Sequence, residues 1–223
     1  SNTSAMVFGG EDSSPLTKTE LWNGSTWTET TDLSTARQYL GGAGTQSSAL
    51  AYGGNNGGTY YNNTEEFTIG GAPLGAWSAA NAMNNARFNL AGTGSTTAAL
   101  ATGGYVSGPG SALTELYDGS SWTEVNDLNT GRYGQASTGS QTSALAAGGT
   151  PPVTGATEKW DGTNWTESGD LNTARRNAAS AGADNEGVIC FGGQPPQRAN
   201  AEVFDGTNWT EVNDLNQARH VLY

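Results

Sequence analysis

The single cysteine and single histidine are the first candidates for chemistry, because thiols and imidazoles serve as nucleophiles, bases and metal ligands. The chain contains only Cys190 and His220 of these two residue types. One thiol and one imidazole make neither a multi-thiolate metal site nor a nucleophile–base–acid arrangement. Cys190 lies in an apolar run, which favours an inert core thiol. We therefore expect no enzyme activity, no cofactor and no metal site.

Carboxylates are the next candidates, since 21 Asp and Glu residues outnumber nine Lys and Arg residues and give a net charge of −12. Paired acids could hydrolyse a glycosidic bond. However, the glutamates recur together with arginines at fixed positions of a repeat, which is typical of structural ion pairs. Aspartates such as Asp127 recur in turns without the loop spacing of a calcium site, so we interpret them as turn caps. The charge also disfavours nucleic acid as a partner.

A repeat of 44 to 50 residues extends over the whole chain. Each unit contains a Gly-Gly pair after an apolar run, then Glu-x-aromatic, then a tryptophan followed by an arginine ten residues later. The recurring residues are Glu20, Glu65, Glu115, Glu158 and Glu202, Trp27, Trp77, Trp122, Trp165 and Trp209, and Arg37, Arg87, Arg132, Arg175 and Arg219. Because they recur in every unit, we assign them to the scaffold, including the tryptophans that could otherwise stack on sugars.

Each unit is expected to form four short antiparallel strands. A small, glycine-rich segment after each arginine suits an innermost strand, and the apolar run after it suits a strand covered on both faces. Pairs such as Asp118-Gly119 predict a hairpin into the fourth strand. These features predict one all-β domain, residues 1–223, that forms a five-bladed β-propeller. The units are 1–37 with 219–223, 38–87, 88–132, 133–175 and 176–219.

The two ends of the chain are expected to meet in the first blade. Counting from Arg219, the C-terminal residues 219–223 fall where an inner strand begins, and residues 1–37 supply the rest of that blade. Pairing of this C-terminal inner strand with the N-terminal blade would close the ring and remove exposed strand edges. The connection before Trp77 is five residues longer than its counterparts and could contact a neighbouring domain or subunit.

The order of Gly-Gly, acidic-x-aromatic, Trp and Arg resembles the kelch repeat over all five units. The amino-acid sequence of units such as TELYDGSSWTEVNDLNTGR is similar to that of kelch-type repeats in virion or surface proteins of marine tailed phages. This resemblance implies a binding or structural module on a virion or extracellular surface, with a host-surface glycan or protein, or a neighbouring virion protein, as its partner. No run of about 18 apolar residues is present, so membrane insertion is not expected.

Non-repeated residues are the functional candidates, because loops on a rigid scaffold often carry recognition. The loops after the Gly-Gly pairs differ most between units and should project on one face. They supply aromatic, amide and cationic side chains: Asn55, Asn56, Tyr60, Tyr61, Asn62, Tyr105, Gln194, Gln197 and Arg198. Such a mixture suits a glycan or a polar protein surface. Two alternatives remain, a purely architectural spacer in a virion protein and a glycan-acting enzyme using loop acids such as Glu11 or Asp12.

Overall fold

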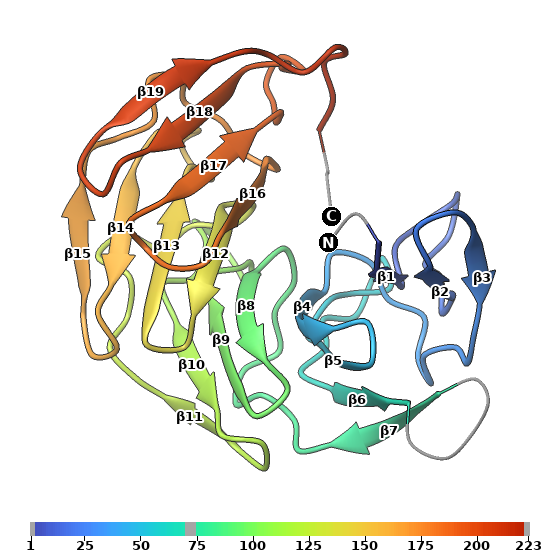
Figure 1. The fold of residues 1–223 in the computed structure, drawn as a ribbon. Helices are drawn as coiled ribbons and strands as arrows, with labels where there is room; N and C mark the ends of the chain where they lie inside the picture. Colours follow the sequence, from blue (N-terminus) through green and yellow to red (C-terminus); the bar gives the residue numbers. More distant parts are fainter. Residues whose placement is uncertain (1–2, 70–74, 221–223) are drawn as a thin grey trace.

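The computed structural model describes residues 3–69 and 75–220, whose strands form five antiparallel sheets arranged as propeller blades (Figure 1). The protein therefore has an all-β, five-bladed propeller fold, as the repeat predicts. The described residues contain no helix, and hence no helix that could cross a membrane.

The blades follow one another along the chain, and in blades 2 to 5 the strands run from the innermost to the outermost. Blade 2 consists of β4 (Gly41–Thr45), β5 (Ser48–Tyr52), β6 (Thr64–Thr68) and β7 (Ala76–Ala80). Blade 3 consists of β8 (Ala91–Ser95), β9 (Ala98–Thr102), β10 (Thr114–Tyr117) and β11 (Trp122–Glu124). Blade 4 consists of β12 (Ala136–Ser140), β13 (Ser143–Ala147), β14 (Thr157–Trp160) and β15 (Trp165–Ser168). Blade 5 consists of β16 (Ala179–Gly182), β17 (Val188–Phe191), β18 (Ala201–Phe204) and β19 (Trp209–Val212).

Blade 1 differs from the prediction, because its sheet contains three strands among the described residues instead of four. They are β1 (Ala5–Phe8), β2 (Thr19–Trp22) and β3 (Trp27–Glu29). The inner strand expected for this blade falls on residues 219–223, of which 221–223 lie outside the described residues. Residues 70–74 of the long connection before Trp77 also lie outside the described residues.

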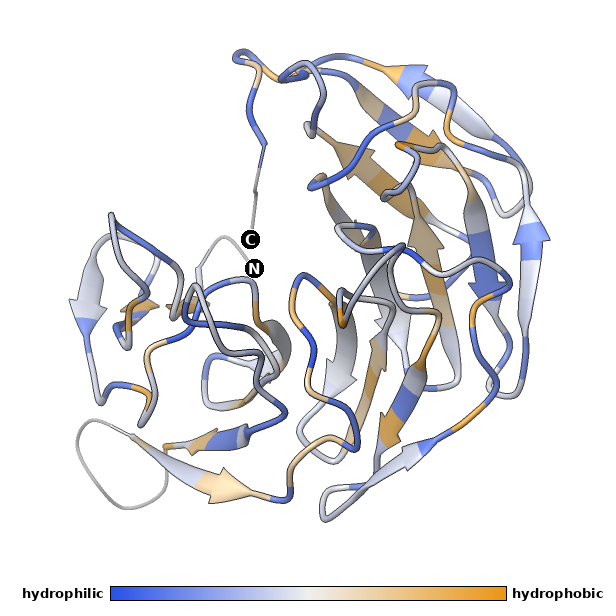
Figure 2. Ribbon diagram, turned by 180° about the vertical axis from the view of Figure 1, so that it is seen from behind, coloured by the Kyte–Doolittle hydropathy of each residue, from blue (hydrophilic) through white to orange (hydrophobic). Residues whose placement is uncertain are grey.

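The core of the propeller lies between neighbouring blades, on both faces of the second strands. Leu50, Leu100 and Leu145, from β5, β9 and β13, have no solvent-exposed surface. Hydrophobic residues accordingly concentrate on the middle strands, whereas the peripheral turns are hydrophilic (Figure 2). The expectation that these strands are covered on both faces is confirmed. Most of the hydrophobic stabilisation therefore comes from stacking one blade on the next.

The glycine-rich composition of the inner strands follows from crowding near the axis. A Cβ atom on Gly92 of β8 would lie 1.8 Å from the Tyr52 hydroxyl oxygen of the preceding blade. Tyr52 is itself completely buried and packs edge-on against Trp122, with 4.9 Å between ring centroids. Only a residue without a side chain fits at that position.

A buried ion pair joins four of the five recurring arginines to a glutamate on the third strand of the blade that follows each. Arg37 and Glu65, Arg87 and Glu115, and Arg132 and Glu158 approach to 2.7, 3.1 and 2.7 Å between nitrogen and oxygen, and Arg175 pairs with Glu202 in the same way. All eight side chains are almost fully buried. The structure thus contains the glutamate–arginine pairing that the repeat predicts at these four places.

Recurring tryptophans on the outer strands fasten each blade to the blade before it. The indole Nε1 atoms of Trp122, Trp165 and Trp209 each donate a hydrogen bond of 3.0 Å to a threonine hydroxyl of the previous blade. These three side chains are buried, and Trp77 makes the corresponding bond to Thr19. Trp27 is the exception, since 45% of its surface is exposed.

Candidate functional site

The loops after the Gly-Gly pairs form one face of the propeller, which we call the loop face. The glycines are needed because both adopt the left-handed region, with φ of 65° and 94° at Gly53 and Gly54. A Cβ atom on Gly53 would lie 2.7 Å from the Arg87 carbonyl oxygen. In blades 2 to 5, the residue after the Gly-Gly pair forms an antiparallel bridge to the residue after an arginine, as Tyr105 does with Phe88. These bridges position the first residue of each loop beside the segment that follows an arginine.

A continuous row of aromatic rings crosses the loop face over blades 2 to 4. Ring centroids are 4.9 Å apart for Tyr60 and Phe88, 5.3 Å for Phe88 and Tyr105, and 5.3 Å for Tyr105 and Tyr133. Tyr39 extends the row, 6.2 Å from Phe88. Tyr60 is 38% exposed and the other rings are partly exposed. We call these five residues the aromatic row. Such packed rings offer a rigid amphipathic surface with hydroxyl groups along it.

The sequence analysis identified Tyr60 and Tyr105 of this row but missed Tyr39, Phe88 and Tyr133. Phe88 and Tyr133 occupy the position directly after the recurring arginine, where other units have Gln38, Arg176 and His220. That variability was the available signal. The variability that assigns the loops to recognition thus applies to this position as well.

Several predicted loop residues support the loop instead of extending from it. Asn55 is buried. The side-chain oxygen of Asn56 accepts hydrogen bonds from the Gly58 and Thr59 amides at 3.2 and 2.8 Å, and its nitrogen donates to the Tyr61 hydroxyl at 2.8 Å. The Asn62 amide donates to the Met83 carbonyl at 2.9 Å. These residues hold the segment that presents Tyr60.

Blade 5 carries the remaining predicted residues, Gln194, Gln197 and Arg198. Gln194 forms an antiparallel bridge with Arg176, and the Arg198 guanidinium donates to the Pro195 carbonyl at 3.0 Å. The Gln197 amide lies 2.8 Å from Nδ1 of His220. The structure therefore separates the predicted residues into an aromatic part on blades 2 to 4 and a cationic part on blade 5.

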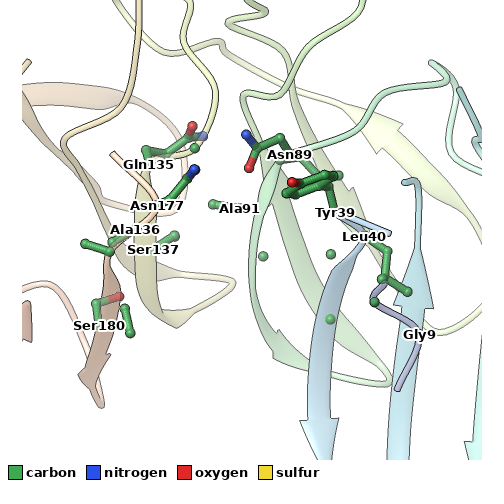
Figure 3. A pocket seen from close by; sticks show the side chains of 18 of the residues that line it. Gly9, Tyr39, Leu40, Asn89, Ala91, Gln135, Ala136, Ser137, Asn177 and Ser180 are labelled. Atoms are coloured by element: carbon green, nitrogen blue, oxygen red, sulfur yellow. The ribbon is translucent and has the colours of Figure 1, made fainter. Parts of the chain in front are cut away.

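A cavity with a volume of about 450 Å³ lies between the inner strands, and of the aromatic row and the predicted blade 5 residues only Tyr39 lines it (Figure 3). The Asn89 and Asn177 side chains point toward its open space (Figure 3), whereas the buried Gln135 amide donates a hydrogen bond of 2.9 Å to the Thr102 carbonyl. Burial and the nearby Glu11 carboxylate raise the pKa of the Tyr39 phenol, while the Arg176 charge acts in the opposite direction. No acidic or basic side chain lines this cavity among the described residues.

The described residues with reactive groups serve the scaffold. Burial raises the pKa of the Cys190 thiol to about 12, so the thiolate is not formed at neutral pH. Backbone hydrogen bonds from Ser121 and Ser120 lower the pKa of Asp118 to about 2, as expected for a turn cap. Within the described ranges, no three His, Cys, Asp or Glu side chains gather as a metal site would require.

Comparison with protein-family models and with curated proteins finds no match to this chain. The functional argument therefore depends on the loop face itself.

Proposed function

We propose that this propeller is a non-catalytic binding module, displayed on a phage virion or another extracellular surface, whose loop face holds a host-surface glycan. The proposal includes the kelch type of the repeat units and their phage origin. Two features support these points: the order of Gly-Gly, Glu-x-aromatic, Trp and Arg in each unit, and the amino-acid sequence of the units. Fold alone does not define a function, so the loop face has to carry the argument.

The aromatic row is the observation that carries the proposal. The glutamates, arginines and tryptophans of the four buried ion pairs and the four indole hydrogen bonds are accounted for by contacts within and between blades, whereas the side chains of the row take no part in those contacts. Its rings pack against one another and are therefore already ordered, so that little side-chain entropy is lost on binding. The C–H faces of sugar rings can stack on such a surface, and the tyrosine hydroxyls can bond to sugar hydroxyls.

The test is binding of the protein to an array of bacterial surface polysaccharides and their oligosaccharides. Tyr60→Ala and Tyr105→Ala should each weaken binding at least about tenfold, because tyrosines at the centre of an interface commonly contribute more than about 1.4 kcal/mol. Val203→Ala on β18 is the matched control, since Val203 is exposed to 37% and Tyr60 to 38% but Val203 lies in a blade strand. Thermal unfolding of each variant separates lost binding from lost folding.

Two results would overturn the proposal. One is wild-type affinity of both tyrosine variants. The other is absence of binding to every polysaccharide on the array, which would favour an architectural role or a protein partner.

We further propose that the ring closes by pairing of the C-terminal inner strand, from Arg219 onward, with β1. Glu20 and Arg219 occupy the positions of the buried ion pairs, yet both are exposed. In blade 4, the Asn129 side chain, three residues before Arg132, donates a hydrogen bond of 2.9 Å to Glu158. Asn216 occupies the same position relative to Arg219. Glu20, Arg219 and Asn216 are therefore available to form, between blade 5 and blade 1, the contacts that join the other blades.

A further inference from the structure

Arginines without a carboxylate partner are confined to one region of the described structure. The chain has nine lysines and arginines. Four arginines form the buried ion pairs, and Lys18 and Lys159 pair with Glu29 and Glu186. The three that remain are Arg176, Arg198 and Arg219, for which the described residues provide no ion pair. In a protein of net charge −12, this gathering of unpaired positive charge is unexpected.

The backbone holds these arginines next to one another on the loop face of blade 5. The Arg176 amide donates to the Gln194 carbonyl at 2.8 Å, and the Arg198 amide donates to the Gly193 carbonyl at 2.9 Å. Arg176 and Arg198 therefore flank residues 193 and 194. The Arg219 amide donates to the Arg198 carbonyl at 3.0 Å. Arg219 is the partner of Glu20 in the proposed closed ring, which leaves Arg176 and Arg198 for a ligand.

The two guanidinium groups have unused hydrogen-bonding capacity. The Nε atoms of Arg176 and Arg198 are buried without a hydrogen-bond partner, as are those of three ion-paired arginines, so a ligand would meet the terminal nitrogens. Arg198 uses one terminal nitrogen to donate to the Pro195 carbonyl, which orients its guanidinium. Guanidinium groups bind carboxylates through paired, charge-assisted hydrogen bonds, and a partly fixed guanidinium loses less entropy when it does so. An anionic group is the natural partner of such a pair.

Arg176 lies directly beside the aromatic row in the order of the ring. It occupies the same unit position as Phe88 and Tyr133, one blade further along, and its charge acts on Tyr39. A ligand resting on the aromatic row would therefore reach Arg176 without leaving the loop face. The overall negative charge of the protein disfavours a densely charged polyanion.

We propose that Arg176 and Arg198 form a carboxylate subsite, and that the glycan held by the aromatic row is an acidic one with uronic-acid-type sugars. This inference rests on the proposed glycan-binding function and names its ligand class. The aromatic row contacts the sugar rings, and the two arginines bind a carboxylate of the same chain. A neutral glycan would use only the row.

The test compares two probes, tri-galacturonate and its methyl ester, which share rings and linkage but differ in charge. The wild-type protein should bind tri-galacturonate at least about tenfold more tightly than the ester, since charge-assisted hydrogen bonds are stronger than those between neutral groups. Arg176→Gln with Arg198→Gln should remove this preference and leave affinity for the ester unchanged. Lys18→Gln with Lys159→Gln is the matched control, because it removes two positive charges elsewhere and should keep the preference.

The outcomes distinguish this inference from the proposed function. Equal affinity of the wild-type protein for both probes overturns the carboxylate subsite but leaves glycan binding by the aromatic row intact. A preference that survives in the arginine double variant, or that is lost equally in the lysine double variant, also overturns the subsite. Failure of both probes to bind overturns the subsite as stated, and failure of the whole polysaccharide array overturns the proposed function as well.

Discussion

Replacing Arg132 with Met is expected to lower the free energy of unfolding by about 3–5 kcal/mol. The substitution leaves the Glu158 carboxylate, now 2.7 Å from an Arg132 nitrogen, buried without a positive partner. An isolated buried charge is costly because the lost hydration is not replaced. Asn129 would still donate two hydrogen bonds to Glu158, so a loss at the lower end of this range is reasonable. Chemical denaturation measures the effect.

Two controls show whether the buried charge is the cause. Lys18→Met breaks the ion pair between Lys18 and Glu29, whose side chains are 55% and 56% exposed, and should cost far less than Arg132→Met because solvent screens this pair. Adding Glu158→Leu to Arg132→Met should recover much of the loss, because no unpaired charge then remains. A loss below about 1 kcal/mol for Arg132→Met would contradict a structural role for the recurring ion pairs.

The second large effect is expected at the recurring tryptophans, where it tests ring closure. Trp165→Ala should cost about 3–5 kcal/mol, because the buried indole leaves a cavity among Leu100, Leu128 and Trp160. If the ring closes, blade 5 covers Trp27 in the same manner, and Trp27→Ala should cost within about 1.5 kcal/mol of Trp165→Ala. The difference allows for one hydrogen bond, since Ala201 replaces the threonine that accepts from the other indoles.

An open ring gives a different result. Trp27 would then keep its 45% exposure, and its removal should cost only about 1 kcal/mol. A large gap between Trp165→Ala and Trp27→Ala would therefore contradict closure, while leaving the five-bladed fold unaffected. Both variants are read by the same denaturation experiment, and both remove the same side chain from the same position of a unit.

The fold was predictable because each feature of the repeat has a local physical cause. Gly92 predicts an inner strand since nothing larger fits beside Tyr52, and Asp118-Gly119 predicts a hairpin through its turn chemistry. The spacing of tryptophan and arginine likewise indicated contacts that the structure contains. The fourth strand predicted for blade 1 stays a prediction, because residues 221–223 lie outside the described residues.

The candidate site was only partly predictable, because it is assembled across blades. Tyr60 follows one Gly-Gly pair, while Phe88 follows an arginine in the next unit, and their contact arises from the bridges that align the two segments. Asn62 was predicted to take part in recognition because of its residue type, but its amide donates a hydrogen bond to the Met83 carbonyl. Side-chain type identified the right face, and tertiary contacts decided which residues are available on it.

Hydroxyl-radical footprinting of the protein, saturated with the strongest glycan found on the array, tests the central claim most directly. Reduced oxidation of Tyr60 and Tyr105 is expected in the complex, together with unchanged oxidation of Val203, which is exposed on β18. Protection confined to the Asp-Gly hairpin turns, with Tyr60 and Tyr105 oxidised as in the free protein, would contradict binding at the loop face.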